Sequence, residues 1–175
     1  MNDVSTSDSA RSEFVYTRVI NAPRNLVFEA YTQPEHLQHW WGPKGMGINV
    51  HRFELRPGGT FLYGMVLPDG HESFGKLVYR EVEPTTKLVF VVSFTDADGN
   101  PVRHPMAATW PLEVLSTVEF SEENGKTTLT MTSRPINAAD EDHAIYASSF
   151  AGMTGGTDGM MENFEAYLDS VIKSA

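Results

Sequence analysis

Apolar and polar residues alternate over most of the chain, a pattern typical of β-strands with one buried face. A first strand is predicted over 14–22, followed by two short helices that meet at Pro34. Turn signals separate the later strands: Pro-Gly-Gly at 57–59, Pro-Asp-Gly at 68–70 and Glu-Asn-Gly-Lys at 123–126. Those strands are expected around 52–55, 61–65, 73–83, 87–95, 114–120 and 128–132.

The hydrophobic period changes to that of an α-helix near the C-terminus. The apolar stripe of this helix consists of Met160, Met161, Phe164, Leu168, Val171 and Ile172. An apolar sheet face and an amphipathic helix are both buried when they pack together. The predicted fold class is therefore α+β, with a curved antiparallel sheet of about six to seven strands wrapped around a long C-terminal helix. We expect one domain over 13–175 and a disordered polar tail over 1–12.

Charge and composition argue against several classes of partner. The chain has 23 acidic and 13 basic residues, a net charge of −10, so nucleic acid and anionic membranes are not expected as partners. The longest apolar run, 88–92, is far shorter than the ~20 residues that span a bilayer, so no membrane insertion is expected. The chain has no cysteine, and residues 1–12 lack the pattern of a signal peptide, which favours a cytoplasmic protein. The sequence does not decide the oligomeric state, and a dimer is one of the states that fit.

Several short motifs follow one another in a specific order along the chain. They are Ala22-Pro23, Val27-Phe28, Ala30, Pro34-Glu35, Leu37, Trp40-Trp41-Gly42-Pro43, Leu55-Arg56-Pro57-Gly58-Gly59, Pro68-Asp69-Gly70, Tyr79-Arg80-Glu81-Val82 and the run 125–130. Together they resemble the activator of heat-shock-protein ATPase homologue family over residues 14–170. This family belongs to the START-like (SRPBCC) superfamily, which it shares with birch-pollen-allergen proteins and polyketide cyclases. The resemblance implies a helix-grip fold and a cavity between the sheet and the long helix.

Two positions depart from the family pattern. Gly156-Thr157 stands where the family often has Gly-Trp, and Thr85 stands where it has a second proline. The first departure removes a large side chain beside the implied cavity. We therefore expect this cavity to be larger or more open than in a typical relative.

Four glycines, at 152, 155, 156 and 159, recur at helical spacing. Each costs about 0.5–1 kcal/mol relative to alanine inside a helix. One interpretation is a helix face that lets the helix approach the sheet closely or that leaves space for a ligand. The other is a loop or frayed segment, with the helix beginning near Asp158.

An interior rich in Met, Phe and Tyr with few polar anchors is typical of ligand cavities. The two adjacent tryptophans fit two interpretations: both are hydrophobic lids, or one packs against the sheet and the other rims the cavity mouth. The loop 96–111 is long enough to cover the entrance. The candidate cavity residues are Trp40, Trp41, His51, Phe53, Phe61, Tyr63, Met65, Phe90, Trp110, Ser116, Met131, Met153, Gly156 and Met160.

Residues able to carry chemistry are few. His51 is predicted to point inward, where it could orient a ligand, act as an acid or base, or bond to a backbone carbonyl. Glu35, His36 and His39 resemble a helical metal pair without a third ligand, so no metal site is predicted. No nucleophile–base arrangement or phosphate-binding loop stands out, and we predict no catalytic residue and no cofactor.

Three functions fit these observations. The leading one is a binding protein for a small hydrophobic ligand, aromatic or lipid-like, with no established catalysis. The second is a polyketide-cyclase-like enzyme, or a lyase or hydrolase, that uses His51 together with Tyr63 or a loop residue. The third is a protein-interaction module, as the family name suggests for co-chaperones, although the additional chaperone-binding domain of such proteins is expected to be missing here.

Overall fold

Seven antiparallel strands form one open sheet in the order β1-β7-β6-β5-β4-β3-β2. The computed structural model describes residues 13–43, 45–104 and 107–174, and the tail predicted to be disordered, 1–12, lies outside them. The strands are β1 (Phe14–Ile20), β2 (Ile48–Phe53), β3 (Thr60–Val66), β4 (Glu72–Glu83), β5 (Lys87–Thr95), β6 (Val114–Glu123) and β7 (Lys126–Pro135). The helices are α2 (Arg24–Thr32), α3 (Pro34–Trp40), α4 (Asp140–Ser148) and α5 (Phe150–Ser174).

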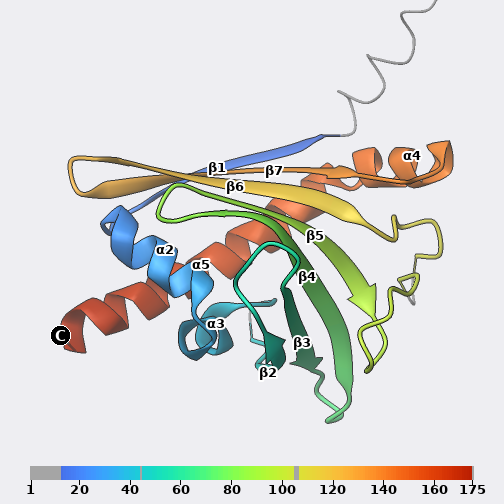
Figure 1. Ribbon diagram of the computed structural model, residues 1–175, viewed down its shortest axis with the longest axis horizontal. Helices are drawn as coiled ribbons and strands as arrows, with labels where there is room; N and C mark the ends of the chain where they lie inside the picture. The colour runs from blue at the N-terminus through green and yellow to red at the C-terminus, as the bar shows by residue number, and fades with distance from the viewer. Residues whose placement is uncertain (1–12, 44, 105–106, 175) are drawn as a thin grey trace, which may run out of the picture.

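The sheet curves around α5, which runs across its inner face (Figure 1). The helices α2 and α3 lie near the end of α5 that carries the C-terminus, and α4 lies at its beginning. From β2 to β7, each strand pairs with the next strand in the sequence. The strand β1 is the exception, since it pairs with β7 and forms one edge of the open sheet. The predicted α+β helix-grip fold is confirmed, and the structure adds the separate helix α4.

Turn residues set the ends of these elements. Pro34 opens α3, where its missing N–H would have no helical partner. Asn124 and Gly125 have φ values of 55° and 76°, as the tight hairpin between β6 and β7 requires. Thr85, between β4 and β5, has a φ of 65°. A proline ring holds φ near −65°, so the proline of the family pattern does not fit this turn.

The strand β1 holds α5 through alternate residues. The ring of Phe14 lies 5.6 Å from that of Phe150 at the start of the helix. The hydroxyl of Tyr16 donates a 2.6 Å hydrogen bond to Asp158. Two turns further along α5, the carboxylate of Glu165 accepts two hydrogen bonds from the guanidinium of Arg18, at 2.9 and 3.1 Å. These contacts span much of the helix, so the edge strand fixes α5 along its length.

The C-terminal half of α5 packs into a region full of aromatic side chains, which we call the filled end. The indole of Trp40 lies 4.3 Å from the ring of Phe164, and its Nε1 donates a 3.0 Å hydrogen bond to the carbonyl of Ala30. Burial of these large rings is the main stabilising contribution of the interior. The filled end consists of Phe28, Tyr31, Trp40, Phe61, Phe120, Phe164 and Leu168.

The N-terminal half of α5 is helical from Phe150 onward, so the interpretation of a loop that lasts until Asp158 is wrong. Gly152, Gly155 and Gly156 are exposed, and a Cβ built on any of them would meet nothing within 4 Å. These three glycines therefore do not bring the helix close to the sheet. Because they face away from the sheet, they do not create the interior space either.

The predicted inward orientation of His51 is wrong. A β-bulge in β2 between Val50 and Arg52 interrupts the alternation, so Val50 and Phe53 pack inward while His51 lies on the outer face. The imidazole is 40% exposed and its Nε2 lies 2.7 Å from the carboxylate of Glu72. This bond is the largest cause of a lowered pKa at Glu72, and an accepted hydrogen bond from Asn49 adds to it.

Candidate ligand-binding cavity

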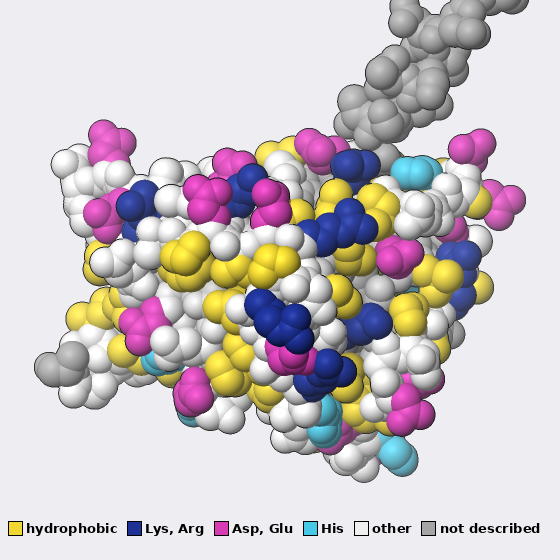
Figure 2. All heavy atoms as spheres, in the orientation of Figure 1, with side chains coloured by type: hydrophobic (Ala, Val, Ile, Leu, Met, Phe, Trp, Pro, Cys, Tyr) yellow, Lys and Arg dark blue, Asp and Glu magenta, His cyan; other side chains and the backbone are white. Residues whose placement is uncertain are grey.

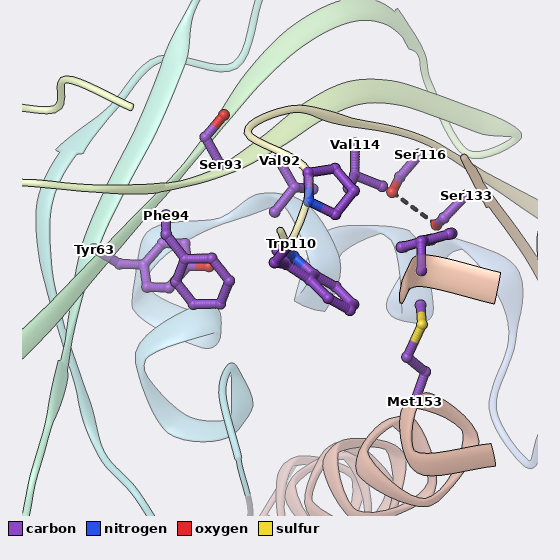
Figure 3. Close-up of a pocket in the computed structure, with 11 residues that line it drawn as sticks. Tyr63, Val92, Ser93, Phe94, Trp110, Val114, Ser116, Ser133 and Met153 are labelled. Atoms are coloured by element: carbon purple, nitrogen blue, oxygen red, sulfur yellow. Dashed lines mark hydrogen bonds between the residues drawn. The ribbon is translucent and has the colours of Figure 1, made fainter. Parts of the chain in front are cut away.

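A cavity of about 230 Å³ lies between the inner face of the sheet, the loop that leads into β6, and the beginning of α5 (Figure 3). Its walls come from β3, β5, β6, β7, α4 and α5, so residues distant in the sequence meet there. Among the described lining residues none is charged. They are Tyr63, Val92, Ser93, Phe94, Trp110, Pro111, Val114, Ser116, Ser133, Tyr146 and Met153.

The sheet wall of the cavity contains a pair of serine hydroxyls. Ser116 of β6 and Ser133 of β7 face each other in register, and their Oγ atoms lie 2.8 Å apart. Both residues are buried, and Val114 continues the same inner face of β6 (Figure 3). The hydroxyl of Ser93 is directed away from the other labelled side chains. The polar part of the sheet wall is therefore the Ser116–Ser133 pair.

Tyr63 forms the wall on the side of β3. Its ring lies over Gly75, the residue opposite it on β4, and a Cβ on Gly75 would come within 2.7 Å of the Tyr63 hydroxyl. A glycine at this position therefore makes room for the ring. Burial raises the pKa of Tyr63, partly offset by a contact with Trp41, so the phenol stays protonated at neutral pH.

The loop between β5 and β6 covers the cavity and carries Trp110. The indole lies 5.4 Å from the ring of Tyr146 on α4. Arg103 Nη1 donates hydrogen bonds of 3.0 Å both to the carbonyl of Trp110 and to the buried carboxylate of Asp142. Asp142 also accepts a 3.1 Å bond from the backbone N–H of Ala139 at the start of α4. The covering loop is thus fastened to α4 by a charge-assisted bridge.

The helical wall is made by Tyr146 and Met153. Tyr146 is fully buried, and its hydroxyl has no hydrogen-bond partner among the described residues. Burial raises the pKa of this phenol, while the nearby hydroxyl of Ser133 partly offsets the rise. Tyr146 and the two serines therefore line the same cavity. Met153 contributes a flexible thioether that adapts to the shape of a neighbour.

Several of the predicted site residues meet at this cavity, and others belong to the packed core. Tyr63, Trp110, Ser116 and Met153 line it. His51 and Gly156 do not, for the reasons given above. The remaining predicted residues lie in or against the hydrophobic core: Trp40, Trp41, Phe53, Phe61, Met65, Phe90, Met131 and Met160. Trp41 is half-buried, with its ring 6.0 Å from that of Tyr63, so it supports the cavity wall from outside the lining.

Ser133 and Val114 were missed as site residues, although the alternation of their strands carries the signal. Ser133 shares the parity of Leu129 and Met131, and Val114 shares that of Ser116. Tyr146 was considered as a hydrogen-bonding group but not placed among the cavity residues, and α4, which carries it, was not predicted as a separate helix. The bridge between Arg103 and Asp142 joins residues 39 positions apart, and no local pattern indicates such a contact.

The two histidines of the apparent metal pair have other neighbours. His36 Nδ1 lies 2.5 Å from the hydroxyl of Tyr167 on α5, and the ring of His39 stacks on Tyr167 at 5.1 Å. Among the residues that the structure describes, no group of three or more His, Asp or Glu side chains is arranged to hold a metal ion. These histidines join α3 to α5.

A curved antiparallel sheet around one long C-terminal helix, with a cavity at one end, defines the helix-grip class of START-like proteins. A solved structure from Mycobacterium smegmatis, protein Ms6760, is 25% identical and superposes with a TM-score of 0.73 over 90% of this chain and 91% of that one. A protein from Staphylococcus epidermidis is 26% identical, with a TM-score of 0.70 over 91% and 90%. One from Arthrobacter aurescens shares the fold at 23% identity, with a TM-score of 0.77 over 93% and 88%.

The family model described as Activator of Hsp90 ATPase homolog 1-like protein matches residues 21–169, and the chain belongs to this family. The resemblance seen in the sequence motifs is thus confirmed. No curated protein matches the chain.

Proposed function

We propose that this protein binds a small, largely apolar molecule in the cavity beneath the Trp110 loop. The observation that carries the proposal is the cavity itself, an uncharged space of about 230 Å³ with aromatic, aliphatic and thioether walls. Ligand pockets are typically lined in this way, with a few polar groups that fix orientation. Unfilled apolar volume is also destabilising, because the lining atoms lose packing partners. A ligand of matching shape restores those contacts.

The lining restricts the charge of the ligand. A buried ionised group needs an opposite charge or several hydrogen bonds, and no described lining residue supplies a charge. The Arg103–Asp142 bridge is already paired and fastens the loop. The supported ligand is therefore uncharged, and its size is that of one or two fused rings.

A catalytic function that uses His51 and Tyr63 loses its support. The imidazole of His51 lies on the outer face of the sheet and pairs with Glu72, whereas Tyr63 faces inward. Acid–base catalysis requires both groups within reach of one substrate atom. The two side chains lie on opposite faces, so they do not form such a site.

The surface supports the expectation that nucleic acid is not a partner. Acidic and basic side chains lie beside one another on the face seen in Figure 2. In the densest basic stretch, Arg52 and Arg56 both pair with Glu54, which offsets one of their two positive charges. Among the described residues, no helix is long and apolar enough to cross a membrane. The absence of cysteine from the sequence favours a reducing compartment, the cytoplasm, as the place of action.

The test is a screen of uncharged aromatic and lipid-like compounds by thermal shift, with native mass spectrometry to count bound molecules. Compounds that fit are expected to raise the melting temperature, by an amount that grows with the logarithm of the ratio of ligand concentration to Kd. Val114→Phe is the matched control, because the larger ring occupies the cavity from its sheet wall. We expect this variant to remain folded and to lose the shift. A screen in which no compound class stabilises the wild-type protein would contradict the proposal.

A further inference from the structure

Three hydroxyl groups gather at one end of the cavity, and their hydrogen bonds are incomplete. Ser116 and Ser133 share one hydrogen bond, which uses one of their two hydroxyl hydrogens. The Tyr146 hydroxyl lies close enough to Ser133 to have its pKa lowered by it, yet it is buried and makes no hydrogen bond of good geometry with any described residue. A buried hydroxyl without a partner is destabilising, and such groups are rare in folded proteins. This cluster therefore has hydrogen-bonding capacity that the described part of the chain does not use.

A second buried tyrosine without a partner shows what is particular to this cluster. Tyr31 also has an unpaired hydroxyl, but it lies in the filled end. The rings of Trp40, Phe120 and Phe164 surround it at 4.9, 5.5 and 5.8 Å. Tyr31 does not line the cavity, whereas Tyr146 does. Of these two buried hydroxyls, that of Tyr146 therefore belongs to a residue that lines the cavity.

Resting on the binding function proposed above, we infer that Tyr146, Ser116 and Ser133 form a hydrogen-bonding subsite for one uncharged oxygen function, a carbonyl or a hydroxyl, on a ring-containing apolar ligand. The phenol of Tyr146 donates to that oxygen, and the serine hydroxyl hydrogen left over from the Ser116–Ser133 bond is the second donor. The aromatic and aliphatic walls hold the rest of the molecule. Because no described lining residue is charged, the subsite selects a neutral ketone, aldehyde or alcohol over a carboxylate.

Two probes that differ by a single oxygen test this inference. Indane and 1-indanone have nearly the same shape, and only 1-indanone has a carbonyl. Their dissociation constants are measured by calorimetry or by ligand-observed NMR for the wild type and for Tyr146→Phe. One hydrogen bond contributes about 1 kcal/mol, so the ratio of the indane constant to the 1-indanone constant should fall about fivefold to tenfold in Tyr146→Phe. Binding of indane itself should change little.

Tyr31→Phe is the matched control, since it also removes a buried unpaired hydroxyl but does so away from the cavity. Its ratio should equal that of the wild type. Ser133→Ala serves as a second variant should Tyr146→Phe fold poorly, and it should lower the ratio in the same direction. If both probes bind and the ratio is the same in the wild type, Tyr146→Phe and Ser133→Ala, the subsite is overturned while the binding function stands. If neither probe binds the wild type at millimolar concentration, the binding function and the subsite both fall.

Discussion

The two ends of α5 share one helix and one sheet, yet they differ in how the interior is occupied. At the C-terminal end, Phe164 and Leu168 are fully buried among aromatic rings. At the N-terminal end, Met153 faces a cavity of about 230 Å³, and the opposite face of the helix carries exposed glycines. The strand β6 shows the same contrast, because Val118 is completely buried and Val114 borders the cavity. A helix-grip fold can therefore use one end of its interior for stability and leave the other for a ligand.

The largest expected difference between the two ends concerns added volume on one strand. Val118→Phe inserts a ring into space that is already filled and should lower the free energy of unfolding by about 1–3 kcal/mol. Val114→Phe places the same ring in the cavity and should change it by less than about 1 kcal/mol. Urea denaturation of both variants measures the two values. Equal destabilisation would show that the interior near Val114 is as tightly packed as that near Val118.

Alkaline pH compares the two ends through buried tyrosines. Burial raises the pKa of Tyr31, in the filled end, and of Tyr146, at the cavity, above the ordinary value of 10.0. Because the folded pKa exceeds the unfolded one, this contribution to stability is complete below pH 10 and is lost as the pH rises above it. Each such tyrosine makes the free energy of unfolding fall by about 1.4 kcal/mol more per pH unit in this range.

Tyr31→Phe and Tyr146→Phe should each remove one tyrosine from this slope, as denaturation at pH 9 to 11 would show. Absorbance at 295 nm follows the ionisation directly in the folded protein. A slope that is reduced by Tyr31→Phe alone, with normal ionisation of Tyr146, would mean that water reaches the cavity end freely.

A smaller effect is expected on the solvent face of α5. Gly155→Ala adds a Cβ that meets nothing within 4 Å, so it should stabilise the helix by about 0.5–1 kcal/mol. Gly75→Ala is the contrasting variant, because its Cβ would come within 2.7 Å of the Tyr63 hydroxyl and should destabilise the protein. Thermal denaturation of both variants checks the signs. A loss of stability in Gly155→Ala would indicate that this glycine has a contact or a conformation that the structure does not show.

The fold could be predicted because its elements are local. Alternating strands, turn signals and the apolar stripe of the last helix each depend on neighbouring residues, and the structure contains all of them. The orientation of His51 could not be derived from alternation alone. Ile48 and Val50 share one phase and Phe53 and Leu55 the other, so the phase change between 50 and 53 is the signal of the bulge.

The cavity was harder to predict than the fold because it depends on which side chains fail to fill a space. The glycines and Thr157 were expected beside the cavity, but Gly152, Gly155 and Gly156 face solvent and Thr157 is not among the lining residues. Tyr146 and Ser133 meet only through the packing of α4 against β7. Contacts of this kind depend on tertiary structure, and the sequence shows the parity of Ser133 without showing its neighbour.

The most direct test of the difference between the two ends is the distribution of xenon in a crystal of the protein under xenon pressure. Xenon enters apolar cavities and cannot enter a close-packed core. We expect a xenon atom in the cavity beside Trp110, Val114 and Met153, and none among the aromatic rings around Phe164. Xenon at the filled end, or an empty cavity under pressure, would contradict this account.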